Sequence, residues 1–483
     1  MTDETRPKAR AVRGFQDRRA DVLAAERRIV TAVSEVYESF GFELLETPAF
    51  EYADALGKFL PDAERPNAGV FALLDDDDQW MALRYDLTAP LARFVAENAG
   101  KLPKPFRRYA FGPVWRDEKP GPGRYRQFVQ CDADTVGSAR PEADAEIIAM
   151  AVAGYAAAGL APSSYVVRIN NRKLLNGLMS VQGVDDSGQR LAVLRAVDKL
   201  DRLGAAGIAD LLGAGRLDES GAYTKGAGLK QPAIDAVLAF VAARRQTRGE
   251  TLDALSGLVG SSNEGAAGLD ELARIGQALS GLGVGETAAV IDPAVVRGLE
   301  YYTGAVFEAE LVGADEGRFG SVGGGGRYDD LVARFTGEST PATGFSFGVS
   351  RLAAALAEAE PAARERVRGP VVVIAFETLR MADYFAAAAE LRAEGVAAEV
   401  YLGESGMRAQ MKYADRRASP AAVIMGEDEI AAGQVTVKDL DLGRKLAEGV
   451  TDNRAWREDR PGQVTAPRAQ LAATVKQILD SQT

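Results

Sequence analysis

The stretch FRRYAFGPVWRDEKPGPGRYRQFVQCDADTVG, residues 106–137, predicts two apolar strands that flank a Pro/Gly turn at 119–123. Residues 101–126 carry eight basic and two acidic side chains, a local charge of +6. The hairpin is therefore expected to hold Arg116 and Arg124 near one another in a field that attracts polyanions. Guanidinium groups offer forked donors that match phosphate oxygens.

The alternative interpretation of this stretch is a solvated basic hairpin. The aromatic residues Tyr125 and Phe128, which follow Arg124 closely, favour a binding site instead, because solvated faces rarely combine arginines with aromatic rings.

The composition of the whole chain excludes several classes of function. The 483 residues contain 57 Lys and Arg against 69 Asp and Glu, so the net charge is −12 and a generally basic nucleic-acid coat is excluded. There is no histidine, which removes Ser-His-Asp triads, His-ligated zinc and imidazole bases. The single cysteine, Cys131, excludes an internal disulfide and a cysteine metal cluster, and indicates a reducing compartment.

Changes of pattern along the chain predict its domains. Residues 1–15 look like a polar tail, and 16–180 and 288–360 alternate strands with helices. Between them, 181–287 has helical spacing and predicts an inserted helical domain. Residues 369–483 alternate strands and helices and predict a small α/β domain with a largely parallel sheet. No stretch approaches the ~20 apolar residues of a membrane span, and no secretory signal is evident, so we expect a cytoplasmic protein.

Three further strings carry candidate chemistry. RGLEYYTGAVFE, 297–308, places an arginine and two tyrosines before a strand, and is equally compatible with an aromatic core strand. SVGGGGRYDDL, 321–331, lacks the spacing of a phosphate-binding loop, so a tight turn between strands is expected there. GFSFGVSRL, 344–352, leads into a helix with Arg351 in its first turns, where a lone arginine is usually a surface residue.

Taken together and in this order, the strings resemble the class II histidyl-tRNA synthetases. Residues 106–137 resemble motif 2, 344–352 resemble motif 3, and RGLEYYTG is similar to a signature of the histidine enzymes. RYDLTAPLARF, 84–94, resembles the amino-acid-binding loop, and 413–440 resemble the C-terminal anticodon-binding domain. The resemblance covers about residues 13 to 445.

The resemblance implies the fold class α+β: a catalytic core on an antiparallel sheet with a helical insertion, plus a C-terminal α/β anticodon-binding domain at 369–483. It implies that L-histidine and ATP form histidyl-adenylate, and that the histidyl group is then transferred to the 3′ end of tRNA(His). The substrate carboxylate is itself the nucleophile, so the lack of a histidine base is no obstacle. A homodimer joined near residues 40–60 is also implied.

The resemblance also implies which residues bind ATP and carry the chemistry. Arg116 is expected at the α-phosphate, Arg351 on the γ-phosphate side and Phe128 on the adenine, with Glu118 at the adenine or ribose edge. The implied ATP-binding set is Arg116, Glu118, Arg124, Tyr125, Phe128 and Arg351, and Mg²⁺ is expected to accompany the phosphates. The implied catalytic set is Arg116, Arg297 and Arg351, and no metal-ligating residue is expected, because Arg297 supplies charge that other class II enzymes obtain from a metal.

For histidine, the resemblance implies acceptors for the ammonium group and a matched pair for the imidazole, which presents one donor and one acceptor. Asp134 is expected to accept from one ring nitrogen and the Tyr302 hydroxyl to donate to the other. The implied histidine-binding set is Asp86, Thr88, Gln130, Asp134, Arg297, Tyr301 and Tyr302.

The chain departs from the family pattern at several places. Ser350 stands where motif 3 usually has an acid, and Asp134 is one methylene shorter than the usual Glu. The turn residues Lys119 and Gly121, implied to contact the tRNA acceptor end, stand where bacterial members commonly read Arg-Pro-Gln, so we expect the acceptor end to be recognised differently. The string at 197–201, VDKLD, looks more like eukaryotic-type members.

Two alternatives remain from the sequence. The first is the non-enzymatic regulatory subunit of an ATP phosphoribosyltransferase, which shares the catalytic fold but typically lacks the anticodon domain and the ATP arginines. The second is a class II ligase for another amino acid, against which RGLEYYTG argues.

Overall fold

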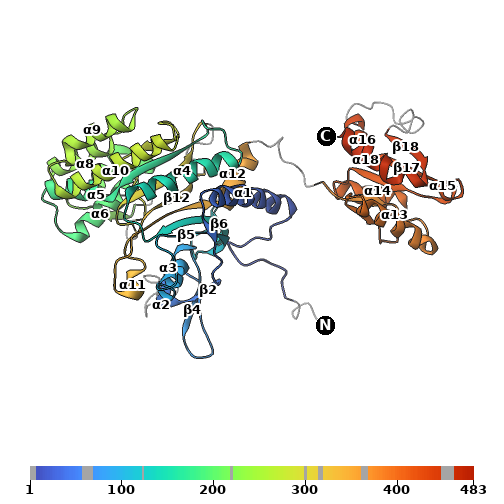
Figure 1. The fold of residues 1–483 in the computed structure, drawn as a ribbon, viewed down its shortest axis with the longest axis horizontal. Coiled ribbons are helices and arrows are strands. Elements are labelled where there is room, and N and C mark those ends of the chain that lie inside the picture. Colours follow the sequence, from blue (N-terminus) through green and yellow to red (C-terminus); the bar gives the residue numbers. More distant parts are fainter. Residues whose placement is uncertain are drawn as a thin grey trace. The chain divides into compact units, whose positions relative to one another are not determined.

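The computed structural model describes residues 7–56, 69–121, 124–217, 221–298, 302–313, 319–359, 368–447 and 462–482. The chain divides into two compact units, Met1–Pro361 and Ala362–Thr483, which are taken one at a time below (Figure 1).

The first unit is built on an eight-stranded sheet in the order β1-β5-β6-β13-β12-β11-β7-β10. The neighbours from β5 to β7 are antiparallel, and only the edge pairs β1–β5 and β7–β10 are parallel. The antiparallel-sheet core predicted from the sequence is thus confirmed. The strands are β1 (Glu43–Leu44), β5 (Phe106–Trp115), β6 (Gln127–Val136), β7 (Tyr165–Asn171), β10 (Ala289–Ile291), β11 (Ala305–Leu311), β12 (Ser321–Arg327) and β13 (Ala342–Gly348).

The predicted hairpin at 106–137 is present as β5 and β6, which pair from Phe106↔Val136 to Trp115↔Gln127. Alternation along β6 divides its side chains between the two faces of the sheet. Cys131 and Ala133 are fully buried in the main hydrophobic core, whereas Gln130, Asp132 and Asp134 point to the opposite face. That opposite face is the one on which a polar site is built.

Helices cover the apolar face of the sheet. In α1 (Ala20–Ser39) the residues Ile29, Val33 and Tyr37 recur at helical spacing and are buried. Figure 1 shows α1 beside α4 (Pro141–Ala157) and α12 (Val349–Ala359). With one face covered in this way, the other face is left for ligands.

The glycine string at 321–331 does not form the tight turn that we expected. Residues 321–327 form β12, a central strand between β11 and β13. A Cβ on Gly323 would lie 2.2 Å from the Tyr155 hydroxyl, and one on Gly325 would lie 2.0 Å from the Gly344 carbonyl. The glycines are needed because neighbouring groups approach this strand closely, which is a tertiary requirement that the local pattern does not show.

The helical segment predicted at 181–287 consists mainly of helices, with one small hairpin of β8 (Gly215–Leu217) and β9 (Tyr223–Lys225). Its last helix, α10, packs on α4 and on α5, so the segment rests on the core. The helices of the segment are α6 (Ser187–Val197), α7 (Leu200–Leu212), α8 (Gln231–Val241), α9 (Arg248–Val259) and α10 (Asn263–Gly281), and α5 (Arg172–Val181) directly precedes them.

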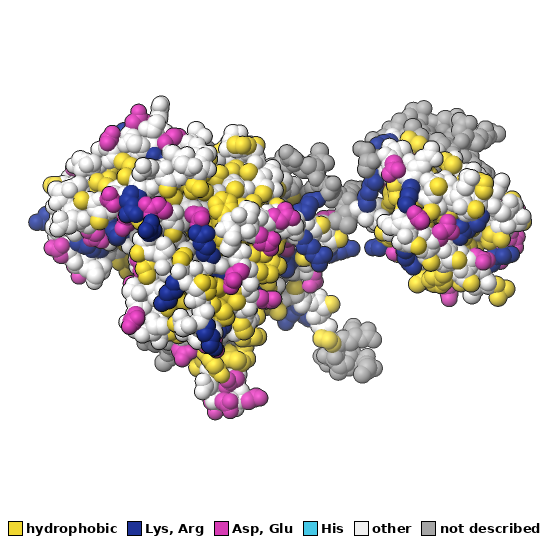
Figure 2. All heavy atoms as spheres, viewed as in Figure 1, with side chains coloured by type: hydrophobic (Ala, Val, Ile, Leu, Met, Phe, Trp, Pro, Cys, Tyr) yellow, Lys and Arg dark blue, Asp and Glu magenta, His cyan; other side chains and the backbone are white. Residues whose placement is uncertain are grey.

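A small sheet in the order β2-β4-β3 extends from the first unit. The hairpin of β3 and β4 ends in an acidic tip at 75–78, whose magenta side chains mark the lowest point of Figure 2. Several large apolar side chains on this sheet are between 41% and 53% exposed: Phe50, Tyr52, Leu73, Leu74 and Trp80. The elements are β2 (Phe50–Tyr52), α2 (Ala53–Leu56), β3 (Ala72–Leu74), β4 (Trp80–Leu83), α3 (Thr88–Glu97) and α11 (Ala333–Thr336).

The second unit contains a five-stranded sheet in the order β15-β14-β16-β17-β18 with its own apolar core. Only β14 pairs in parallel, with β15 and β16, and the other two pairs are antiparallel. The prediction of a largely parallel sheet is therefore correct for two of the four strand pairs. The elements are β14 (Val371–Val373), α13 (Met381–Ala393), β15 (Ala398–Val400), α14 (Met407–Arg416), β16 (Ala421–Ile424), α15 (Glu427–Ala431), β17 (Gln434–Asp439), α16 (Leu440–Ala447), β18 (Gln463–Pro467) and α18 (Leu471–Ser481). Within the described parts of both units, no helix has the length and apolar character of a bilayer span.

Candidate active site

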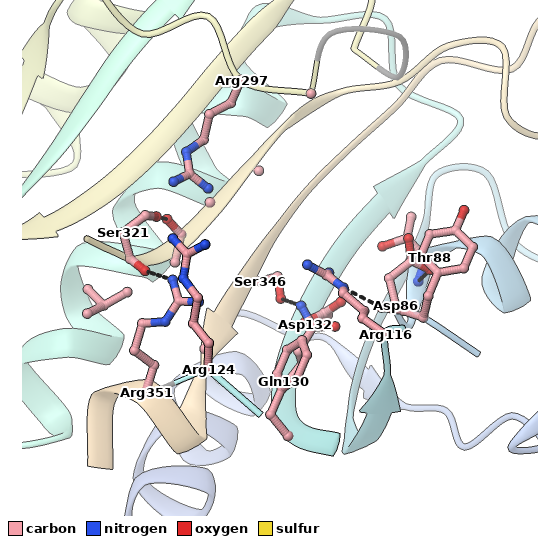
Figure 3. Close-up of a pocket in the computed structure, with 18 of the residues that line it drawn as sticks. Asp86, Thr88, Arg116, Arg124, Gln130, Asp132, Arg297, Ser321, Ser346 and Arg351 are labelled. Carbon is pink, nitrogen blue, oxygen red and sulfur yellow. Dashed lines mark hydrogen bonds between the residues drawn. The ribbon is translucent and has the colours of Figure 1, made fainter. Parts of the chain in front are cut away.

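A cavity of about 590 Å³ lies on the polar face of the large sheet. Figure 3 shows side chains from β6, β12, β13 and α12 converging on it, together with Arg116, which directly follows β5. It brings together eleven of the residues predicted from the sequence: Asp86, Thr88, Arg116, Glu118, Arg124, Tyr125, Phe128, Gln130, Arg297, Tyr302 and Arg351.

Arginines gather at one end of this cavity. Arg124, Arg297 and Arg351 lie together there, and the Arg351 Nη1 donates to the Ser321 carbonyl at 2.6 Å (Figure 3). Burial lowers the pKa of Arg351, and the charges of Arg124, Arg297 and Arg116 lower it further. The negative charge of Glu118 opposes this lowering, but its effect on the pKa is the smallest of these influences. The cavity therefore holds positive charge that an anionic ligand can neutralise.

Arg116 lies between the arginine end and the acidic end of the cavity (Figure 3). Its Nε donates to the Tyr85 carbonyl at 3.0 Å, and its guanidinium carbon lies 5.1 Å from the centre of the Phe128 ring. These two contacts fix the guanidinium group in place before any ligand arrives.

Arg297 stands at the junction of the large cavity with a second cavity of about 90 Å³. It forms an ion pair with Glu308 of β11, whose side chain is only 11% exposed. Asp198, which follows α6, lines both cavities as well. A residue from the helical segment thus reaches the same site as Arg297.

The other end of the cavity carries hydrogen-bond acceptors. The Asp86 carboxylate accepts from the backbone amides of Thr88 at 3.2 Å and Ala89 at 2.9 Å, at the start of α3. Burial raises the pKa of Asp86, while these two amides and Arg116 oppose that shift. The Gln130 amide nitrogen donates to the Ser346 hydroxyl at 2.5 Å, which leaves its buried carbonyl oxygen without a partner.

Asp134 is not among the residues that line the cavity. Its carboxylate pairs with Arg108 at 2.8 Å and accepts from the Tyr328 hydroxyl, beneath the cavity surface. Asp132, two residues earlier on the same strand, lines the cavity and has one buried oxygen without a hydrogen-bond partner. Burial, followed by the neighbouring Asp134, raises the pKa of Asp132 to about 8. Strand alternation placed both acids on one face, but the sequence did not show which of them opens to the cavity.

This raised pKa predicts a pH-dependent stability. Between about pH 4 and pH 8 the folded chain retains a proton on Asp132 that the unfolded chain has lost, so the free energy of unfolding falls as pH rises. We expect Asp132→Asn to remove part of this slope and to gain on the order of 1–3 kcal/mol relative to wild type between pH 5 and pH 9. Urea unfolding across this range measures it, with the exposed Asp76→Asn as control. An Asp132→Asn difference independent of pH would contradict the assignment.

The remaining predicted residues lie elsewhere. Lys119 and Gly121 do not line the cavity; the Gly121 and Arg124 backbones bond to each other at 2.9 and 3.1 Å across the turn. Tyr301 lies outside the described residues. Ser350 donates to Glu26 at 2.6 Å and accepts from the Val129 amide at 2.9 Å, so it supports the packing of α12 rather than a metal. Among the described residues, no group of three or more acidic or thiol side chains is arranged to hold a metal ion.

Sequence reasoning missed several residues that line the large cavity. For Asp198, the unusual VDKLD string at 197–201 was a usable signal. The residues of β12 and β13 belong to the strings at 321–331 and 344–352, which were singled out, but only the sheet shows that they line this cavity. The missed residues are Tyr85, Asp132, Asp198, Gly298, Ser321, Val322, Gly323, Gly324, Gly325, Ser346 and Gly348.

Comparison with known proteins supports what the geometry indicates. A family model for histidyl-tRNA synthetase matches residues 14–352, and one for an anticodon-binding domain matches residues 371–458. The histidine–tRNA ligase of Caulobacter vibrioides is 67% identical over 98% of this chain and 97% of its own length. That of Brucella suis is 52% identical over the same shares.

A solved structure of a histidyl-tRNA synthetase has a similar fold to this chain. The crystal structure of histidyl-tRNA synthetase from a Nostoc species has a TM-score of 0.73 at 28% identity, covering 98% of this chain and 100% of that one. With the family model matching well over half of the residues, the chain belongs to the histidyl-tRNA synthetase family.

Proposed function

We infer that the chain is a histidine–tRNA ligase, which activates L-histidine with ATP to histidyl-adenylate and transfers it to the 3′ end of tRNA(His). Relatives of nearly equal length carry that name at 67% and 52% identity. The regulatory-subunit alternative is disfavoured, because the chain has both the arginine cluster and a second unit matched by the anticodon-binding model.

The observation that carries this function is the group of four arginines in one cavity, in which Arg116, Arg124 and Arg297 are close enough for their charges to act on Arg351. Adenylate formation joins two anions, the histidine carboxylate and the α-phosphate of ATP. Fixed guanidinium groups neutralise both and stabilise the charge that develops at phosphorus. Because the carboxylate attacks directly, no side-chain base is required.

For ATP, we propose that Arg116 binds the α-phosphate and Arg351 the γ-phosphate side. Phe128, already beneath the Arg116 guanidinium, is placed to stack on adenine, with Glu118 at the adenine or ribose edge. Mg²⁺ is proposed to enter on the phosphate oxygens, since the described carboxylates of the cavity form no metal-binding group.

For histidine, we propose that Asp86, Thr88 and Gln130 accept from the ammonium group. The free carbonyl oxygen of Gln130 and the carboxylate of Asp86 support this assignment. Tyr302 is proposed to contact the imidazole. We propose Asp132 as its acceptor, because Asp132 lines the cavity and has an unpartnered oxygen, in place of Asp134, whose carboxylate is held by Arg108 and Tyr328.

The direct test is ATP–pyrophosphate exchange with each of the twenty amino acids. We expect exchange with histidine alone, because the buried polar groups are proposed to match one donor and one acceptor at the spacing of an imidazole ring, and an amino acid that leaves them unpaired is rejected. Exchange with another amino acid, or none with histidine, would overturn the proposal.

The acceptor-end turn gives a further prediction. Because Lys119 and Gly121 depart from the Arg-Pro-Gln turn that the family resemblance implies for bacterial members, we expect removal of the extra 5′ guanosine of tRNA(His) to change kcat/KM for charging by less than about tenfold. An anticodon substitution is expected to cost more. Aminoacylation of transcripts with and without that nucleotide measures both effects, and a loss as large as in ordinary bacterial enzymes would contradict the proposal.

We also propose a homodimer and a cytoplasmic location. The exposed apolar side chains of the β2-β4-β3 sheet, including Phe50, Tyr52 and Trp80, support an interface near the predicted region 40–60. Residues 57–60 of that region lie outside the described part of the chain. Sedimentation equilibrium is expected to give a mass of about 102 kDa, twice the 51.2 kDa of one chain.

A further inference from the structure

Arg172, the first residue of α5, holds both ends of the segment that leads into β11. Its Nη2 donates to the Gly298 carbonyl at 2.6 Å, and its backbone amide donates to the Gly304 carbonyl at 2.9 Å. The residue is 7% exposed and lines neither cavity. It therefore acts on this segment rather than on a ligand.

The Gly298 carbonyl connects Arg172 to two residues of the site, Arg297 and Tyr302. It follows Arg297 directly, and it also accepts from the Tyr302 backbone amide at 3.3 Å. Gly298 has a φ of +61°, and a Cβ there would lie 2.2 Å from the Tyr302 ring. Arg297, proposed for the reacting anions, and Tyr302, proposed for the imidazole, thus share one anchoring point.

The chain retains a costly buried cation at this point. Among the described residues Arg172 forms no ion pair, and its Nε is buried without a hydrogen bond. Burial lowers the pKa of Arg172, and the charge of Asp198 is the largest influence that opposes this. Asp198 belongs to the VDKLD string and lines both cavities, so the helical segment contributes to holding Arg172 charged.

We propose that Arg172 is a positioning residue that sets the placement of Arg297 and Tyr302 through the Gly298 carbonyl, and thereby the efficiency of histidine activation. The inference rests on the proposed function. It deepens that function by adding a residue that touches neither substrate.

The test compares Arg172→Gln and Arg172→Lys with Arg248→Gln in histidine-dependent pyrophosphate exchange. Arg248 is a control of the same residue type and burial, because it is 5% exposed, donates to the Ala289 and Val284 carbonyls and lines neither cavity; unlike Arg172 it also pairs with Glu286 at 3.3 Å. Arg172→Gln is expected to lower kcat about 10²-fold and to raise KM for histidine more than KM for ATP, because Tyr302 is proposed to contact histidine alone. Arg172→Lys keeps the charge and is expected to restore part of the loss, whereas Arg248→Gln lowers the melting temperature alone.

The outcomes separate the inference from the function on which it rests. Equal effects of Arg172→Gln and Arg248→Gln on kcat, or equal increases of KM for both substrates, would overturn the positioning role. If Arg172→Gln does not fold, Arg172→Lys decides by the same criterion: wild-type kinetics would overturn the role. A wild-type protein without histidine-dependent exchange would overturn the proposed function, and with it the inference.

Discussion

Arg116→Gln is expected to reduce kcat/KM for histidine-dependent pyrophosphate exchange about 10³-fold while leaving the fold intact. Arg116 is fixed by the Tyr85 carbonyl and lies over the Phe128 ring, so its guanidinium does not need to reorganise when phosphate arrives. Gln retains the side-chain polarity but removes the charge and the forked donors. Steady-state exchange and a melting curve on the same preparation measure the two effects.

Arg107→Gln is the matched control, because Arg107 is in β5, which ends just before Arg116, but pairs with Glu146 at 2.8 Å and does not line the cavity. It is expected to change exchange by less than about threefold, since surface ion pairs contribute roughly 0–1 kcal/mol. If Arg116→Gln and Arg107→Gln lost exchange activity equally, the proposed role of Arg116 at the α-phosphate would be disproved.

Gly344→Ala is expected to destabilise the first unit by about 3–5 kcal/mol. Gly344 is in β13, opposite Asp134 of β6, and a Cβ there would lie 2.1 Å from the Asp134 carboxylate and 2.9 Å from the Ala133 carbonyl. The Asp134 carboxylate then has to move away from Arg108, and the buried guanidinium charge of Arg108 loses its ion-pair partner. Urea unfolding measures the loss of free energy, and the histidine site is expected to be lost with it.

Gly257→Ala is the opposite case. This glycine is inside α9, and a Cβ there would meet nothing within 4 Å. The substitution is expected to stabilise the protein by about 0.5–1 kcal/mol, because alanine loses less backbone entropy in a helix. A Gly344→Ala protein as stable as wild type would show that the sheet beneath the site is looser than its packing indicates.

Local pattern was enough for the hairpin and the helices. The Pro/Gly turn between two alternating strands predicted β5 and β6, and apolar spacing predicted α1. The same reasoning failed at β12, because glycine runs resemble turns and only the approach of Tyr155 and the Gly344 carbonyl shows why a strand needs them. In the second unit, strands of parallel and antiparallel pairs have similar apolar sequences. The antiparallel direction of β17 and β18 could therefore not be predicted from the sequence.

The site was predictable in its chemistry but not in its details. Strand parity places Asp132 and Asp134 on one face, yet Tyr328 and Arg108, which withdraw Asp134 from the cavity, come from distant parts of the chain. Arg172 gave no local signal, because the carbonyl that it holds is 126 residues away. Contacts between distant segments carry this information, and a periodicity cannot show them.

The central claim is that the arginines of one cavity bind two anionic reactants together. A crystal structure with histidine and a non-hydrolysable ATP analogue tests it most directly. The account predicts Arg116 and Arg297 within about 3 Å of α-phosphate or carboxylate oxygens, and Arg351 equally close to the γ-phosphate. Guanidinium groups that point to separate faces, with the phosphates bound elsewhere, would contradict it.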